Sequence, residues 1–215
     1  NKMKINTSSF LLLGKGKTYQ HCRNFFIENS IAYDAINTDD VLKINNKALI
    51  TNDKRIDLDK IDYIVISPGI SPDNHIVEVC RSMSIKIITD IDILQSISDV
   101  KCICITGTNG KTSTVELLAS ILNDNGVKSI ACGNNGVSVF DSLKGNYKYL
   151  IIELSSYQLQ YISNLKSYIS VILNLSHDHI ERHGKISNYF QTKKKIFLNS
   201  QYSIISSDIN EKIDD

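Results

Sequence analysis

The sequence predicts an α/β protein built from two parallel-sheet domains, the first Rossmann-like and the second of the P-loop, mononucleotide-binding kind. Short apolar runs alternate with amphipathic stretches through the 215 residues, as they do in β-α-β units. In addition, the glycine-containing stretch TGTNGKTS at 106–113 stands between an apolar run and an amphipathic one. Phosphate-binding loops occupy this position between a strand and a helix.

Nine apolar runs are predicted strands, four before residue 90 and five after it. They are 8–14, 31–36, 62–67, 85–89, 101–106, 128–132, 148–154, 168–176 and 201–206. The strand pattern restarts after a helix-like stretch at 90–99, and no proline- or glycine-rich linker marks a boundary there. We therefore expect a first domain at 1–94 and a second at 95–215.

Composition limits the classes of function. An apolar content of 42% is enough for a real core, and the net charge of +1 offers no basic surface for a nucleic acid. No apolar run reaches the roughly 18 residues of a membrane span. We expect a cytoplasmic, monomeric protein whose partners include neither nucleic acid nor a membrane.

The cysteines form an odd set of five, which favours buried free thiols over a disulfide framework. They are Cys22, Cys80, Cys102, Cys104 and Cys132. The C-x-C pair leaves a metal or redox role open.

The phosphate-loop pattern is shorter than usual. In G-x-x-x-x-G-K-[ST] the first glycine would stand at position 105, where this chain has Ile105. Gly107 and Gly110 still allow close backbone approach, Lys111 supplies positive charge and Thr112 a hydroxyl for Mg²⁺. The predicted ATP-binding residues are Gly107, Thr108, Asn109, Gly110, Lys111, Thr112 and Ser113. The alternative is an ordinary polar turn between a strand and a helix.

Three later segments carry chemistry-bearing side chains. Glu153 stands where a strand should end, on the same sheet edge as the loop, and could reach a metal. The segment NLSHDHIERH at 174–183 gathers three histidines and an aspartate, which leaves a zinc site open as an alternative. The lysines at 193–195 must point in different directions on a helix, and most such runs are solvated.

Together these segments resemble the Mur ligase family of ATP-dependent amide-forming enzymes. The resemblance rests on the motifs TGTNGKT, GNNG at 133–136, ELSSYQL at 153–159, NLSHDHIERH, and Tyr189 followed four residues later by Lys193. ELSSYQL is similar to the branch that adds D-glutamate to UDP-N-acetylmuramoyl-L-alanine in peptidoglycan synthesis. SPGISP at 67–72 also fits that branch, so the resemblance covers nearly the whole chain.

The resemblance implies a two-step reaction in which ATP phosphorylates the substrate carboxylate and the amine of D-glutamate attacks the acyl phosphate. The implied catalytic residues are Lys111, Glu153, His179 and Lys193. One Mg²⁺ would lie on Thr112, and a second on Glu153, His179 and Lys193, the lysine having captured CO₂ as a carbamate. The muramoyl-alanine end would face Asn134, Ser155, Gln158 and His179, with Asp178 orienting its neighbour.

The first domain would hold the UDP part of the substrate. GKGKTY at 14–19 resembles a Rossmann turn, but Tyr19 stands where a third glycine would pack, which speaks against NAD. By the resemblance, the UDP-contacting residues are Lys17, Thr18, Asn37, Thr38, Ser67, Pro68 and Gly69. The alternative is a purely structural turn.

Length is the main departure from the family, which carries a third, closing domain after the central one. The sequence ends at SSDINEKIDD, partway through the central domain, so we expect this domain to be truncated and the 215 residues to be inactive alone. Two alternatives remain open. One is a related ligase with another acceptor, such as a folylpolyglutamate-type enzyme, against which the UDP-type domain argues. The other is a non-catalytic nucleotide-binding fragment.

Overall fold

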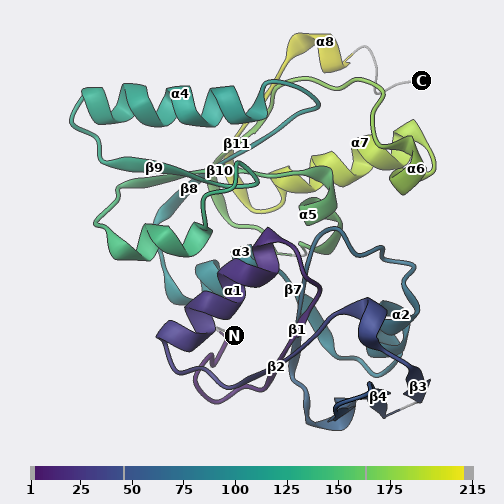
Figure 1. Ribbon diagram of the computed structural model, residues 1–215. Coiled ribbons are helices and arrows are strands. Elements are labelled where there is room, and N and C mark those ends of the chain that lie inside the picture. Colours follow the sequence, from purple (N-terminus) through teal and green to yellow (C-terminus); the bar gives the residue numbers. More distant parts are fainter. Residues whose placement is uncertain (1–2, 46, 163, 211–215) are drawn as a thin grey trace. The chain divides into compact units, whose positions relative to one another are not determined.

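The computed structural model describes residues 3–45, 47–162 and 164–210 (Figure 1). The chain divides into two compact units, Asn1–Ile97 and Ser98–Asp215. The boundary falls three residues later than the position expected from the sequence, because the helix-like stretch after residue 89 is α3 (Asp90–Ile97), which belongs to the first unit. The α/β class with parallel sheets is confirmed.

Unit 1 contains a four-stranded parallel sheet in the order β2-β1-β6-β7. Its strands are β1 (Phe10–Leu13), β2 (Tyr33–Ile36), β6 (Tyr63–Ile66) and β7 (Lys86–Ile88), and its helices are α1 (Lys17–Glu28), α2 (His75–Ser82) and α3. All four residues of β1 are buried, as expected for the central strand of a sheet that is covered on both faces. Chain order reverses on either side of β1, so the segments that follow β1, β2 and β6 leave the same edge of the sheet.

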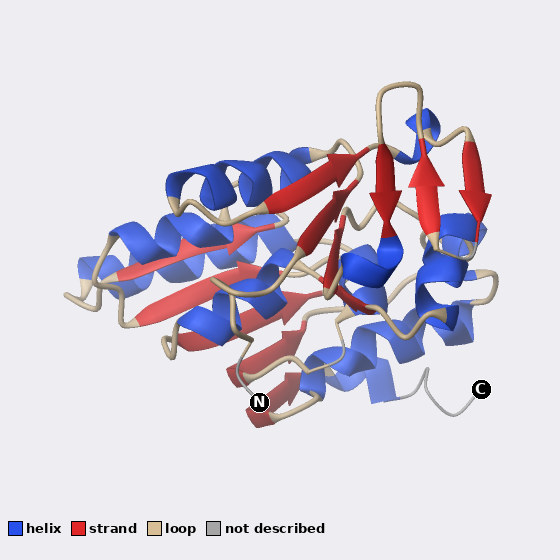
Figure 2. Ribbon diagram, turned by 90° about the horizontal axis from the view of Figure 1, so that it is seen from below, coloured by secondary structure: helices blue, strands red, loops and turns tan. Residues whose placement is uncertain are grey.

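A second, antiparallel sheet in unit 1 was not predicted. It is formed by β3 (Lys43–Asn45), β4 (Ala48–Ile50) and β5 (Arg55–Asp57), three short strands that alternate in direction (Figure 2). Each strand has only three residues, which is too short for an alternating pattern to stand out from the sequence.

Unit 2 contains a five-stranded parallel sheet in the order β12-β11-β8-β10-β9. Its strands are β8 (Lys101–Thr106), β9 (Ser129–Gly133), β10 (Tyr149–Glu153), β11 (Ser167–Ile172) and β12 (Ser200–Ile205). Its helices are α4 (Lys111–Asp124), α5 (Ser156–Tyr161), α6 (Ile180–His183), α7 (Ile186–Lys194) and α8 (Ser207–Asn210). All nine predicted strands are therefore confirmed.

The core of unit 2 lies between its sheet and α4, which runs along the sheet (Figure 1). Ile103, Ile105 and Ile151 from the strands pack against Val115 and Ala119 from the helix. The three central strands β10, β8 and β11 end at neighbouring positions, since Glu153 pairs with Ile105 and Ile172 pairs with Thr106. The loop after β8 therefore lies between the ends of β10 and β11.

The five cysteines are all buried, and none of them forms a disulfide. Burial raises the pKa of the Cys104 thiol well above its usual value, with Cys102 and Cys132 adding to the effect, so this thiol stays protonated. In the described parts of the chain, no helix is long and apolar enough to cross a membrane.

Candidate functional site

The shortened loop is explained by where the sheet ends. Ile105 is buried within β8, so no glycine is needed at this position. Gly110 has φ +77°, which favours glycine. A Cβ on Gly107 would lie 3.1 Å from the Cβ of Leu173, a tight contact that glycine avoids. Gly110 is thus favoured by its backbone conformation and Gly107 by the close approach of Leu173.

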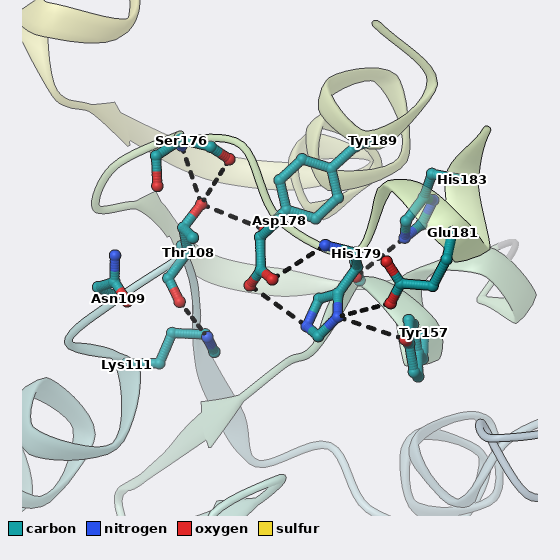
Figure 3. Close-up of polar contacts among 12 residues, drawn as sticks. Thr108, Asn109, Lys111, Tyr157, Ser176, Asp178, His179, Glu181, His183 and Tyr189 are labelled. Carbon is teal, nitrogen blue, oxygen red and sulfur yellow. Dashed lines mark hydrogen bonds and ion pairs between the residues drawn. The ribbon is translucent and has the colours of Figure 1, made fainter. Parts of the chain in front are cut away.

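The loop leads into the N-terminus of α4 with unpaired amides. Gly110 is the N-cap and has no side-chain cap hydrogen bond. Within the described part of the chain, the backbone N–H groups of Lys111, Thr112 and Ser113 have no acceptor. Lys111 folds back over the loop, its Nζ 2.8 Å from the carbonyl oxygen of Thr108 (Figure 3). Free N–H groups at a helix N-terminus beside a lysine form an anion-binding site.

Two residues predicted to bind ATP, Thr108 and Asn109, have their backbone N–H groups bonded within the protein. The N–H groups of Thr108 and Asn109 donate to Oδ1 of Asn174, at 3.0 and 2.9 Å. The Thr108 hydroxyl accepts from the N–H of Ser176 at 3.0 Å and lies 3.2 Å from the hydroxyl of Tyr189 (Figure 3). Asn174 is not among the site residues predicted from the sequence, because it falls inside the predicted strand 168–176, whereas β11 (Ser167–Ile172) ends two residues before it.

Glu153 is a buried carboxylate held only by neutral donors. Its side chain is 1% exposed. Oε2 accepts from the hydroxyl of Thr112 at 2.7 Å, and Oε1 from the side-chain amide of Asn134 at 2.8 Å. Among the described residues, no cationic side chain forms an ion pair with it. A buried carboxylate without a cationic neighbour is costly unless it binds a cation, and carboxylate and hydroxyl oxygens are ligands that suit Mg²⁺.

Lys193 is the buried member of the lysine run. It is 1% exposed, and its Nζ donates to the carbonyl oxygen of Gly107 at 2.8 Å and to the hydroxyl of Thr106 at 3.2 Å. Burial first, and the charge of Lys111 second, lower the pKa of Lys193 to about 7, although Asp178 acts in the opposite direction. A substantial share of this amine is therefore uncharged at neutral pH. Lys194 and Lys195 are only half-buried.

His179 contacts residues other than the predicted metal ligands Glu153 and Lys193. Its backbone has φ +52°, and its ring lies 3.3 Å from Asp178, 3.7 Å from Glu181 and 3.4 Å from the hydroxyl of Tyr157 (Figure 3). The structure shows no contact between it and Glu153. The predicted set of metal ligands is thus brought together only in part: Thr112 contacts Glu153, whereas Lys193 contacts Thr106 and Gly107 at the end of β8.

The histidines at 177–183 have separate surroundings. His183 is buried and lies 3.1 Å from the hydroxyl of Ser156, with the ring of Tyr189 edge-on at 5.2 Å. Burial, with Arg182 second, lowers the pKa of His183. His177 is exposed. Across the described ranges, no three His, Cys, Asp or Glu side chains are grouped so that they could hold a metal, so the zinc alternative lacks a donor set.

The residues predicted to face the muramoyl-alanine end have mixed surroundings. Ser155 and Gln158 form a capping box at the start of α5: Ser155 Oγ accepts from the N–H of Gln158 at 3.2 Å, and Gln158 Oε1 accepts from the N–H of Ser155 at 2.9 Å. Asn134 is exposed and holds Glu153. In this structure, Ser155 and Gln158 stabilise a helix start, whereas Asn134 lies at the sheet edge beside the loop.

Unit 1 gathers its predicted residues at one sheet edge. Gly14 has φ +125°, and a Cβ there would overlap the hydroxyl of Ser67 and lie 2.5 Å from its Cβ. The Ser67 hydroxyl is buried and has no partner in the described part of the chain. Lys15 forms a 2.7 Å ion pair with Asp39, and Asp39 also accepts from Asn37 at 3.4 Å.

The remaining predicted residues of this edge follow the same three strands. Lys17 and Thr18 begin α1, whose first turn contains no acidic residue, and Thr38 begins a 3₁₀ turn after β2. Pro68 and Gly69 follow β6. The edge therefore combines a helix N-terminus without acidic residues and a buried hydroxyl.

Comparison with known proteins identifies the family. Residues 105–214 match the Mur ligase middle domain. The chain is 37% identical over 213 residues to a UDP-N-acetylmuramoylalanine--D-glutamate ligase of Buchnera aphidicola subsp. Acyrthosiphon pisum (strain Tuc7), covering 95% of this chain and 48% of that protein. It is 35% identical over 210 residues to the protein of the same name from Rickettsia prowazekii (strain Madrid E), covering 92% and 46%.

A solved structure shares the fold. The UDP-N-acetylmuramate:L-alanyl-gamma-D-glutamyl-meso-diaminopimelate ligase from Neisseria meningitides has a TM-score of 0.55 at 15% identity, covering 96% of this chain and 74% of that one. The chain spans about half the length of the curated relatives it matches. The middle-domain match covers more than half of the chain, and the chain belongs to the Mur ligase family.

Proposed function

We propose that this protein is an ATP-dependent ligase that adds D-glutamate to UDP-N-acetylmuramoyl-L-alanine in peptidoglycan synthesis, in the cytoplasm. One observation carries the ATP-dependent chemistry: the unpaired amides at the start of α4, the buried Glu153 and the buried Lys193 meet around one loop at one sheet edge. The substrate assignment is supported by two curated relatives that share this name.

The phosphate chain of ATP would lie on the amides of Lys111, Thr112 and Ser113. The Lys111 ammonium would exchange its bond to the Thr108 carbonyl for the moving γ-phosphoryl group, whose negative charge it would stabilise. The substrate carboxylate oxygen attacks the γ-phosphorus and ADP leaves. The amine of D-glutamate then attacks the acyl carbon, loses a proton and expels phosphate.

Glu153 and Thr112 fit a divalent cation. Their oxygens already lie 2.7 Å apart, and the Glu153 carboxylate has only neutral partners. Mg²⁺ bound there would neutralise charge on the phosphates. Asn134 would keep the carboxylate oriented through its amide.

Lys193 fits CO₂ capture as a carbamate. Carbamate formation requires an uncharged amine, which the buried position of Lys193 favours. The reaction replaces a cationic ammonium group with a carbamate, whose oxygens can bind a metal ion. The two atoms that Lys193 now contacts, the Gly107 carbonyl oxygen and the Thr106 hydroxyl, hold it at the base of the loop. His179 would be the remaining ligand, reached by leaving its contacts to Asp178 and Glu181.

The test uses the complete gene product with ATP, Mg²⁺, bicarbonate, UDP-N-acetylmuramoyl-L-alanine and labelled D-glutamate. We expect labelled UDP product, loss of product in Lys193→Ala, and partial rescue by short carboxylic acids that replace the carbamate. Lys194→Ala is the matched control and should retain activity, because Lys194 is the half-buried neighbour. Full activity of Lys193→Ala without added acid would overturn the role of Lys193. Preference for another amino acid would overturn the acceptor assignment alone.

A further inference from the structure

Asn174 closes the phosphate loop from outside it. Its Oδ1 accepts from the N–H groups of Thr108 and Asn109, at 3.0 and 2.9 Å, and its Nδ2 donates to the carbonyl oxygen of Asn109 at 3.0 Å. We infer that Asn174 is a positioning residue that fixes the shape of this short loop for phosphate binding. This inference rests on the proposed ATP site and adds a residue to it.

The sheet brings Asn174 to the loop. Asn174 is the second residue after β11, which pairs with β8, and the N–H of Leu173 extends the ladder to the carbonyl oxygen of Thr106 at 2.9 Å. The backbone carbonyl of Asn174 then accepts from the N–H of Thr108 at 3.1 Å. The absence of a side chain on Gly107 eases this approach, because a Cβ there would lie 3.1 Å from the Cβ of Leu173, the residue before Asn174. The contacts of Asn174 with Thr108 and Asn109, which we call the clamp, therefore join the ends of two adjacent strands, β11 and β8.

The clamp divides the loop amides into two sets. Thr108 and Asn109 donate to Asn174, whereas Lys111, Thr112 and Ser113 have no acceptor in the described part of the chain. The second set remains available to an anion. A longer loop has further residues with which to close on itself, and in this one the side-chain amide of Asn174 supplies that closure.

An asparagine is the side chain that suits this position. One oxygen must accept from two N–H groups while the adjacent nitrogen donates to the Asn109 carbonyl, and a side-chain amide carries both functions. An aspartate would keep the acceptor but place a second oxygen against that carbonyl. A loop held in its binding shape loses less conformational freedom when the phosphates arrive, which favours affinity.

The experiment compares Asn174→Ala and Asn174→Asp with wild type in this chain. Amide hydrogen exchange by NMR, without nucleotide, reports the clamp: Asn109 N–H is the sharper probe, because Thr108 N–H keeps the backbone acceptor. We expect faster exchange at Asn109 in Asn174→Ala and slow exchange in Asn174→Asp. Calorimetry with Mg·ATP should show affinity about tenfold weaker in both, equivalent to the loss of about one or two hydrogen bonds.

Asn123 provides the matched control at the far end of α4. Its side chain makes the same two-way contact, accepting from the N–H of Ser129 at 2.9 Å and donating to its carbonyl oxygen at 3.0 Å. Asn123→Ala should lower the thermal midpoint as Asn174→Ala does, but leave ATP affinity and Asn109 exchange unchanged.

The outcomes separate this inference from the proposed function. If wild type does not bind Mg·ATP, the ATP site is wrong, and unchanged Asn109 exchange in Asn174→Ala would independently remove the clamp. If wild type binds and Asn174→Ala binds equally well, Asn174 does not position the loop. Should Asn174→Ala fail to fold, wild-type affinity in Asn174→Asp would overturn the inference by itself.

Discussion

Glu153 and Lys193 are buried charged side chains that contact the two ends of one loop, and neither forms an ion pair within the described residues. Removing a charge from water is costly unless a partner or a change of protonation offsets it. The Glu153 carboxylate can be offset by a cation, and Lys193 by losing its proton, as its lowered pKa indicates. The energetics at the level of single residues thus favour a metal-dependent anion site.

Replacing Glu153 tests the cation. In wild type we expect Mg²⁺ to increase the affinity for ATP. In Glu153→Gln we expect this increase in affinity to be smaller by at least about tenfold, because a neutral amide is a poor Mg²⁺ ligand. Calorimetric titration of ATP with and without Mg²⁺ measures the difference. Glu116→Gln, on the exposed face of α4, is the control. An undiminished Mg²⁺ effect in Glu153→Gln would exclude Glu153 as a ligand.

Gly14 and Gly16, in the turn between β1 and α1, should differ sharply in how much a substitution by alanine destabilises the protein. Gly14→Ala would place a Cβ against Ser67 at a positive φ, so we expect the free energy of unfolding to fall by about 1–3 kcal/mol. At Gly16 a Cβ meets nothing within 4 Å, so Gly16→Ala should change the free energy by less than about 0.5 kcal/mol. Urea denaturation followed by circular dichroism compares them, and equal losses would contradict the geometry.

At the scale of elements, the major strands could be predicted because buried parallel strands read as continuous apolar runs, as in KCICIT for β8. The small antiparallel sheet could not, because its three-residue strands leave too little pattern. Within the site, Glu153 could be placed by its position at a strand end. The burial of Lys193 rather than Lys194 could not be read from KKK, because tertiary packing of α7 decides it.

The start of α3 gives unit 1 a predicted dependence on pH. Burial raises the pKa of Asp90 to about 7, although the N–H of Ile91 favours the ionised form. A raised carboxyl pKa stabilises the fold at acidic pH, and this contribution is lost as pH rises from about 4 to about 7. Relative to Asp90→Asn, wild type should lose stability over that window, by on the order of 4 kcal/mol at most.

Denaturation of both proteins at pH values from 4 to 8 measures this difference. Asp92, whose pKa burial also raises and whose charge adds to the raised pKa of Asp90, is present in both proteins, so the difference reports Asp90 together with its interaction with Asp92. Asp73→Asn removes an exposed carboxylate and should follow wild type. Parallel stability curves for wild type and Asp90→Asn would show that the Asp90 carboxyl is not desolvated as the structure indicates.

At the scale of the whole molecule, each unit presents its candidate residues at the carboxyl edge of a parallel sheet. In unit 1 they follow β1, β2 and β6, and in unit 2 they follow β8, β9, β10 and β11, with Lys193 reaching the loop from α7. This is where open α/β sheets bind ligands. The two sites have different chemistry: unit 2 pairs free helix amides with a buried carboxylate and a buried lysine, whereas unit 1 offers a helix N-terminus and a buried hydroxyl.

In the proposed reaction, ATP activates the substrate carboxylate as an acyl phosphate. Isotope transfer follows this step when the complete gene product turns over UDP-N-acetylmuramoyl-L-alanine, labelled with ¹⁸O in its alanine carboxylate, with ATP and D-glutamate. We expect one carboxylate oxygen to leave with the phosphate, so the inorganic phosphate released with each amide bond should carry ¹⁸O when examined by mass spectrometry. Amide product formed together with unlabelled phosphate would contradict it.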